Sequence, residues 1–218
     1  MSGSVENLLF TENQLKLQLP CGIIIGGPSS SGKTTLLMKV LQYYPSLFYP
    51  VPVQIVYAYG EYNDYIPSIQ KMGITVVSGS PSDEFLEECQ KPMLLILDDL
   101  MLSTKEEYLK NLFTKKSHHR NIGVIFVTQN LFDPNLRVAR KNSQYLILMR
   151  APNAALDIRN LGTQLFPGRL KYFMDAYNQA TNEPYGYMLI DLHASSHPIL
   201  RLRTNIFPTD NRIVFIPI

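Results

Sequence analysis

The sequence predicts an α/β fold, in which a mostly parallel sheet is covered by helices on both faces. Two observations lead to this prediction. Between residues 22 and 149, short apolar segments rich in β-branched residues alternate with segments whose apolar residues recur at helical spacing. A glycine-rich loop also separates the first buried strand from the first helix. Such alternation is typical of parallel strands joined by crossover helices.

The expected elements divide the chain into three parts of a single domain. We expect a flexible start over residues 1–13, a RecA-like core over residues 14–150, and an appendage packed on that core over residues 151–218. In the core, strands are expected at 15–19, 22–25, 53–59, 74–77, 93–97, 122–127 and 145–149, and helices at 35–45, 82–89, 104–117 and 134–141, with a short segment at 67–70. In the appendage, helices at 154–161 and 170–179 precede a hairpin of strands at 185–190 and 199–206.

The glycine-rich loop matches the phosphate-binding pattern G-x-x-x-x-G-K-[ST] at every fixed position. Its glycines allow a backbone path that a side chain would block, so successive N–H groups can point inward at the N-terminus of a helix. The lysine of such a loop reaches the β- and γ-phosphates, and the hydroxyl after it ligates Mg²⁺. A Gly/Ser-rich turn that matches by chance is the alternative, which the flanking strand and helix disfavour. The predicted ATP contacts are Gly27, Pro28, Ser29, Ser30, Ser31, Gly32, Lys33, Thr34 and Thr35, and Thr34 is also a predicted Mg²⁺ ligand.

The strand at 93–97 ends in two carboxylates, Asp98 and Asp99. Acids at the end of a strand beside a phosphate-binding loop lie where Mg²⁺ and an attacking water are needed. We therefore expect Asp98 to hold Mg²⁺ and Asp99 to orient or deprotonate the water, with Glu61 as a spare candidate for that base. An acidic turn after an ordinary strand is the alternative. A further strand between the loop strand and this one predicts the RecA-like, additional-strand type of P-loop NTPase.

Two polar residues flank the strand at 122–127. Gln129, just after it, is expected to sense the γ-phosphate or its water, with a polar strand cap as the alternative. Arg120, just before it, is a candidate for an arginine that a neighbouring subunit donates to the γ-phosphate, with a solvated surface arginine as the alternative. Arg137 and Arg140 are further candidates for this role or for DNA contacts.

Composition and charge limit the possible functions. No apolar run reaches 18 residues and no signal peptide opens the chain, so neither a membrane span nor secretion is expected. Cys21 and Cys89 are expected to be buried thiols in a reducing compartment. The first 100 residues hold 5 Lys/Arg against 10 Asp/Glu, whereas the remaining residues hold 15 against 8. A polyanionic partner for the basic second half and a solvated basic face are both compatible with this asymmetry.

Five segments of the chain resemble the genome-packaging ATPases of the FtsK–HerA superfamily. The likeness is greatest to the poxvirus-type branch found in Polinton/Maverick elements and adintovirus-like DNA viruses, and it covers about residues 20–207. The phosphate loop is shared with many other proteins, whereas the strand that ends in Gln129 and the C-terminal segments are more specific. Besides the phosphate loop, the similar segments are Leu95-Ile96-Leu97-Asp98-Asp99, residues 118–130 (HHRNIGVIFVTQN), residues 185–192 (YGYMLIDL) and residues 201–205 (RLRTN).

The resemblance implies an ATP-driven motor that moves double-stranded DNA into a capsid. It implies a homo-oligomeric ring of five or six subunits with ATP at the subunit interfaces, a capsid or portal-vertex protein as a partner, and a location in the virion or inside the host cell. Lys33 and Thr34 carry over as nucleotide and Mg²⁺ contacts, Asp98 as the metal holder and Gln129 as the sensor. Many relatives have an Arg-His pair where this chain has His118-His119, so Arg120 is displaced from the family's position.

Two other functions compete with the motor. A small-molecule P-loop kinase would suit the size and the phosphate loop, although no Arg-rich lid is evident. A nucleotide-dependent scaffold without enzymatic activity, for capsid or membrane assembly, would bind ATP without turnover.

Overall fold

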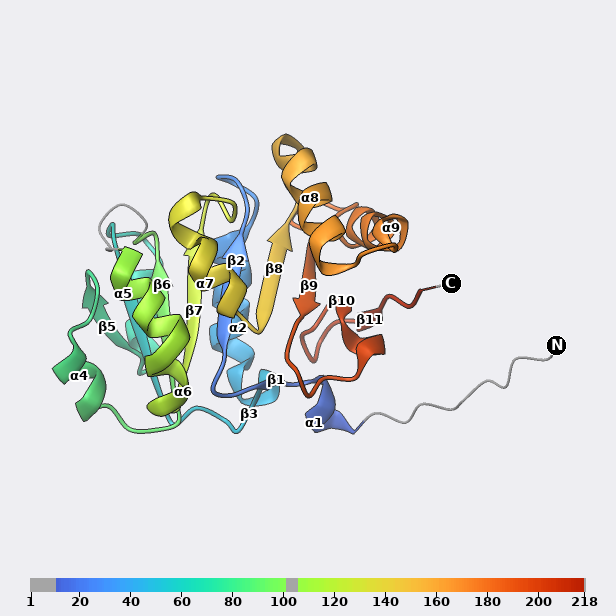
Figure 1. Cartoon of the computed structure of the whole chain (residues 1–218). Coiled ribbons are helices and arrows are strands. Elements are labelled where there is room, and N and C mark those ends of the chain that lie inside the picture. Colours follow the sequence, from blue (N-terminus) through green and yellow to red (C-terminus); the bar gives the residue numbers. More distant parts are fainter. Residues whose placement is uncertain (1–10, 101–105, 218) are drawn as a thin grey trace.

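A single large mixed sheet organises the chain (Figure 1). The structure is a computed structural model and describes residues 11–100 and 106–217. Residues 1–10 of the expected flexible start, and the first two residues of the helix expected at 104–117, lie outside the described residues. Among the described residues the sheet has nine strands in the order β11-β10-β9-β8-β2-β7-β6-β4-β5.

The strands from β8 to β5 in this order run parallel, and those from β9 to β11 run antiparallel. The six parallel strands confirm the predicted α/β class with a mostly parallel sheet. They are β2 (Gly22–Gly26), β4 (Gln54–Tyr59), β5 (Thr75–Ser78), β6 (Met93–Asp98), β7 (Ile122–Thr128) and β8 (Tyr145–Met149). The antiparallel strands are β9 (Tyr187–Asp191), β10 (Leu202–Thr204) and β11 (Ile213–Val214).

Helices cover both faces of the sheet, because successive side chains of each central strand point to opposite faces. In β2, Ile23 and Ile25 pack with α2 (Lys33–Leu47) and α3 (Ile66–Lys71), whereas Ile24 packs into the core of the other face. This alternation with every residue buried is typical of a strand covered on both sides. The second face carries α4 (Asp83–Glu88), α5 (Glu106–Asn111), α7 (Arg137–Asn142), α8 (Ala155–Leu165) and α9 (Leu170–Ala180).

Some element boundaries differ from those expected. Helix α2 runs past Pro45 to Leu47, whose buried side chain favours two more helical residues despite the proline. The helix expected to end at Ser117 continues through a π-helical turn, Leu112–Lys116, into α6 (Ser117–His119). The strand expected at 15–19 is shorter: after α1 (Glu12–Leu15), β1 (Leu17–Gln18) pairs with β3 (Phe48–Tyr49) in a separate two-stranded sheet. Single 3₁₀ turns occupy Pro134–Leu136, Pro152–Ala154 and Pro198–Leu200.

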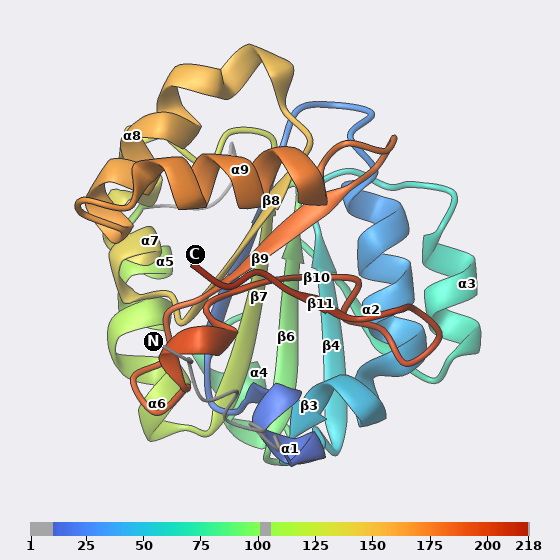
Figure 2. The same cartoon turned by 90° about the vertical axis from the view of Figure 1, so that its right-hand side faces the viewer.

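The segment after β8 extends the sheet instead of forming a second core. Strand β9 pairs with β8 from Met149↔Tyr187 to Tyr145↔Asp191, and α8 and α9 pack over the strands at this side (Figure 2). No helix among residues 11–100 and 106–217 is long and apolar enough to cross a membrane.

A buried ion pair fastens this extension to the start of the chain. The Arg203 guanidinium contacts the Asp191 carboxylate at 2.7 Å, with side chains only 5% and 1% exposed. Arg203 also donates to the carbonyl of Leu15 at 2.7 Å, and Asp191 accepts from the hydroxyl of Ser196 at 3.0 Å. Removal of one partner of such a pair leaves an uncompensated buried charge.

We expect the Arg203→Met substitution to lower the free energy of unfolding by about 3–5 kcal/mol, because Asp191 would remain buried without its counter-ion. Urea denaturation measures this change. Arg159→Met, on an exposed position of α8, is the matched control and should change stability by no more than about 0.5 kcal/mol. An equally stable Arg203→Met variant would contradict the prediction.

Candidate functional site

The predicted site residues other than Arg120 lie at the carboxyl edge of three adjacent strands. Gly26 of β2 pairs with Thr128 of β7, and Val127 of β7 pairs with Asp98 of β6. The strand expected between the loop strand and the acidic strand is therefore β7. The phosphate loop, Gln129 and Asp98 leave the sheet at neighbouring points of the same edge, where ligands bind in open α/β sheets.

The loop holds its lysine close to its own backbone. The Lys33 ammonium donates hydrogen bonds to the carbonyl oxygens of Gly27 at 2.7 Å and Pro28 at 2.8 Å. Burial lowers the pKa of Lys33, and the negative charges of Asp98 and Asp99 oppose that shift. A half-buried cation therefore lies against the loop, within electrostatic range of the two carboxylates.

The interior of the loop has a hydroxyl with unused hydrogen-bonding capacity. Ser31 is buried, and its Oγ has no hydrogen-bond partner among the described residues. Gly32 follows with φ of 94°, a left-handed conformation that favours glycine, and it is the residue from which α2 starts. A buried hydroxyl next to a helix N-terminus is a donor suited to an anion such as phosphate.

Asp98 is held by a tyrosine from the neighbouring strand. The Tyr57 hydroxyl of β4 donates a 2.5 Å hydrogen bond to Oδ2 of Asp98, and the Asn63 amide donates to the same hydroxyl at 3.4 Å. Burial raises the pKa of Asp98, while the hydrogen bond from Tyr57 and the charge of Lys33 lower it. Burial and the charge of Asp98 raise the pKa of Tyr57, so the phenol remains a donor. The sequence alone does not indicate this role of Tyr57, since its partner lies 41 residues away.

Asp99 is exposed and sits in a constrained backbone conformation. Its φ is 53°, in the left-handed region that non-glycine residues seldom adopt. The neighbouring Gly60 cannot be replaced without a backbone shift, because a Cβ there would lie 2.1 Å from the carbonyl oxygen of Asp99. The Gly60 N–H also donates to the carbonyl of Asp98 at 3.0 Å. The path of the chain after β6 is thus fixed by the chain after β4, where exposed Glu61 also lies.

Gln129 contacts the phosphate loop directly. Its Oε1 accepts a hydrogen bond of 3.0 Å from the Ser29 hydroxyl, and the Gly27 N–H donates to the carbonyl of Thr128 at 3.3 Å. The structure therefore brings together the loop, Asp98 and Gln129, as the sequence analysis expected.

Arg120 lies at the opposite edge of the sheet. It precedes β7, so roughly 20 Å of strand separate it from Gln129. Its guanidinium forms ion pairs with Glu87 at 2.6 Å and Asp83 at 3.6 Å, both on α4. Within its own chain Arg120 is remote from the loop. Arg140 donates to the carbonyl of Leu131 at 2.7 Å, whereas Arg137 is exposed.

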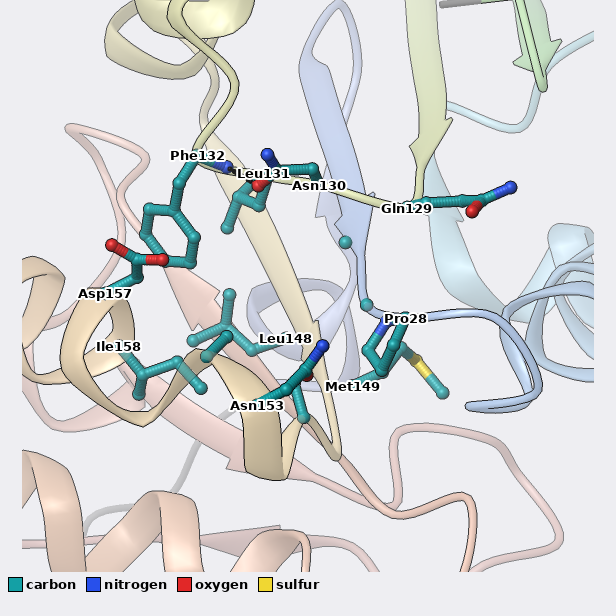
Figure 3. A pocket seen from close by; sticks show the side chains of 14 residues that line it. Pro28, Gln129, Asn130, Leu131, Phe132, Leu148, Met149, Asn153, Asp157 and Ile158 are labelled. Carbon is teal, nitrogen blue, oxygen red and sulfur yellow. Dashed lines mark hydrogen bonds between the residues drawn. The ribbon is translucent and has the colours of Figure 1, made fainter.

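A cavity of about 330 Å³ adjoins the first residues of the loop (Figure 3). It opens between Pro28, the segment after β7 and the start of α8. Apolar side chains such as Leu148 and Ile158 form one part of it, and Asn153 and Asp157 supply polar groups (Figure 3). The cavity lies on the face of the sheet that carries α7 and α8, because Leu148 and Ile158 belong to that core.

The residues at this edge fit ATP and Mg²⁺. Backbone N–H groups at a helix N-terminus, the Lys33 ammonium and the unpartnered Ser31 hydroxyl suit a chain of phosphates. The Thr34 hydroxyl and the Asp98 carboxylate are hard oxygen ligands of the kind that Mg²⁺ takes together with phosphate oxygens and water. Among the described residues no cluster of three or more His, Cys, Asp or Glu could hold a metal by itself.

No protein-family model matches the chain, and no curated protein matches it by sequence. Solved structures do match it. The crystal structure of B204, the DNA-packaging ATPase from Sulfolobus turreted icosahedral virus, aligns with a TM-score of 0.53 and 15% identity over 91% of this chain and 98% of that one. The genome-packaging NTPase B204 from Sulfolobus turreted icosahedral virus 2 aligns over the same shares, with a TM-score of 0.51 and 16% identity in its complexes with ATP-gammaS and AMPPCP. At this identity the likeness shows the fold, which is that of a P-loop NTPase.

Proposed function

We propose that this protein is a Mg²⁺-dependent ATPase of the FtsK–HerA superfamily, in its poxvirus-type branch, and that it drives double-stranded viral DNA into a capsid. The observation that carries the proposal is the convergence of the phosphate loop, Gln129 and Asp98 on the ends of β2, β7 and β6. The fold shared with B204, a DNA-packaging ATPase, supports the choice of a packaging motor.

Each residue at the carboxyl edge of the sheet has a separate role in the proposed reaction. Lys33 transfers its hydrogen bonds from the loop carbonyls to the β- and γ-phosphates and offsets the charge that develops there. Asp99, exposed beside Asp98, orients or deprotonates the attacking water. Gln129 positions that water or the γ-phosphate, since its contact with Ser29 keeps it at the mouth of the loop.

Thr34 and Asp98 would hold Mg²⁺, which would offset the negative charge of the phosphates when it is bound. Tyr57 fixes the orientation of the Asp98 carboxylate and stabilises its ionised form. The other carboxylate oxygen of Asp98, Oδ1, would then be available to bind Mg²⁺.

Arg120 would complete the site of a neighbouring subunit in a ring of five or six. Its position at the far edge of the sheet suits donation to another copy of the chain, because it cannot reach its own loop. To reach the γ-phosphate bound by a neighbouring subunit, the Arg120 guanidinium would have to leave its ion pairs with Glu87 and Asp83. An arginine supplied in this way accelerates hydrolysis by about 10³–10⁵ in other NTPases.

The excess of basic residues after residue 100 supports DNA as the polyanionic partner. A capsid or portal-vertex protein would be the second partner, and the virion or the host cell interior the place of action. A small-molecule kinase would release little phosphate without an acceptor, and a non-enzymatic scaffold would bind ATP without hydrolysing it.

We expect Lys33→Ala to reduce ATP hydrolysis by at least about 100-fold, because the γ-phosphate loses its charged donor. Phosphate release, measured without any acceptor molecule and with Lys171→Ala on exposed α9 surface as the matched control, tests this. Unchanged turnover in the Lys33 variant would refute the proposed site, and silence of the unaltered chain with DNA present would favour the kinase or the scaffold.

We expect Tyr57→Phe to move the acid limb of the ATPase pH profile to higher pH. The lost hydrogen bond stabilises the Asp98 carboxylate, so its removal raises the pKa of Asp98 further and protonates this ligand at a higher pH. The activity of Tyr57→Phe at high pH should change less than its activity at low pH, because Asp98 is ionised there in both proteins. The profile of kcat/KM against pH at saturating Mg²⁺ measures the shift, and an acid limb that stays in place or moves to lower pH would contradict the role of Tyr57.

We expect double-stranded DNA to stimulate ATP hydrolysis several-fold, and more strongly at about 50 mM than at about 200 mM salt, since phosphate contacts release counter-ions. Turnover titrated with duplex DNA at both salt concentrations tests this. A turnover that DNA leaves unchanged at every salt concentration would argue against a DNA motor.

A further inference from the structure

One exposed tyrosine lies directly against the phosphate loop. Tyr185 is 65% exposed, and it precedes β9 in a segment that comes to the same end of the molecule as the loop (Figure 2). A Cβ placed on Gly32 would lie 2.9 Å from both Cβ and Cδ1 of Tyr185, so the tyrosine packs on the glycine that starts α2. An aromatic ring that is mostly exposed gains little from packing alone.

The backbone holds Tyr185 in this place at a conformational cost. Its φ is 63°, in the left-handed region where a bulky residue is rare, and such residues are enriched at ligand sites. The next residue, Gly186, donates to the carbonyl of Glu183 and accepts from the Arg150 N–H, both at 3.0 Å. A Cβ on Gly186 would lie 2.6 Å from the carbonyl oxygen of Ala180, so this turn is closely packed. Tyr185 is therefore fixed to the end of β8 rather than carried on a free loop.

The order of the strands indicates which end of a nucleotide would lie near Tyr185. Gln129 directly follows β7 and Asp98 ends β6, both on one side of β2, and under the proposed function they lie at the γ-phosphate end. Strands β8 and β9 stand on the other side of β2. A triphosphate that spans the loop with its γ-phosphate near Gln129 carries its nucleoside toward β8 and β9, where Tyr185 lies against Gly32.

We propose that Tyr185 is the platform on which the base of the nucleotide stacks, and that the site thereby takes purine nucleoside triphosphates. The inference rests on the proposed nucleotide site and adds the recognition of the base. Every base offers a π-face to an aromatic ring, and the two-ring purines offer the larger one. The exposed face of Tyr185, next to the loop that takes the phosphates, supplies the matching surface.

The test separates the contribution of the base from that of the phosphates. Affinities for ATP, CTP and inorganic tripolyphosphate are measured for the unaltered chain, Tyr185→Ala and Tyr185→Phe. We expect Tyr185→Ala to bind ATP about tenfold more weakly, to lose the preference for ATP over CTP, and to bind tripolyphosphate as before. Tyr185→Phe keeps the ring and should bind all three as the unaltered chain does.

Two control variants make the test specific to this position. Tyr49→Ala removes another exposed tyrosine, on β3 at the opposite end of the molecule, and should change none of the affinities. Asn153→Ala alters the cavity beside Pro28, which is the other place that a base could enter. Under the proposal, Asn153→Ala leaves ATP affinity unchanged.

Each other result overturns the inference in a distinct way. An equal loss of ATP and tripolyphosphate in Tyr185→Ala would show that Tyr185 only shapes the loop around Gly32. Loss of ATP affinity in Asn153→Ala but not in Tyr185→Ala would place the base in the cavity. If the unaltered chain binds neither ATP nor tripolyphosphate, the proposed function itself fails. If the unaltered chain binds both and Tyr185→Ala binds them equally well, only the inference about Tyr185 is overturned.

Discussion

The hydrogen-bonded pairing of β2, β7 and β6 is the constraint on which the candidate site depends. The register sets Gly26 beside Thr128 and Val127 beside Asp98, so one edge receives the loop, Gln129 and the carboxylates at the strand spacing of about 4.8 Å. A shift of one residue would turn every side chain of a strand to the other face. Because both faces are buried under helices, such a shift would disrupt two cores, and the register is strongly determined.

The features that depend on a local sequence pattern could be predicted from the sequence alone. The loop with Lys33, the strand that ends in Asp98 and the strand before Gln129 could all be predicted, because apolar runs and their polar ends are visible within a few residues. The hydrogen bond of Tyr57 to Asp98, the ion pairs of Arg120 with α4 and the contact of Tyr185 with Gly32 could not. Each joins residues that are distant in sequence, and a single sequence gives no register between strands.

The antiparallel strands of the sheet help to position residues at the candidate site. Strand β9 runs beside β8, so the turn before β9 comes to the same edge as the phosphate loop. At the other end of β9, Asp191 and Arg203 form the buried pair that also holds the carbonyl of Leu15. The C-terminal strands are thus joined to the start of the chain at one end and to the nucleotide-binding loop at the other.

The two hydrogen bonds of Lys33 to its own loop also bear on how a phosphate would be received. A free lysine side chain loses up to about 2 kcal/mol of rotamer entropy when it is immobilised. Here the carbonyls of Gly27 and Pro28 already restrict the side chain, so most of that loss belongs to folding. Binding of a phosphate then becomes an exchange of partners at a preorganised ammonium, and its free energy reflects the stronger acceptor rather than the ordering of the lysine.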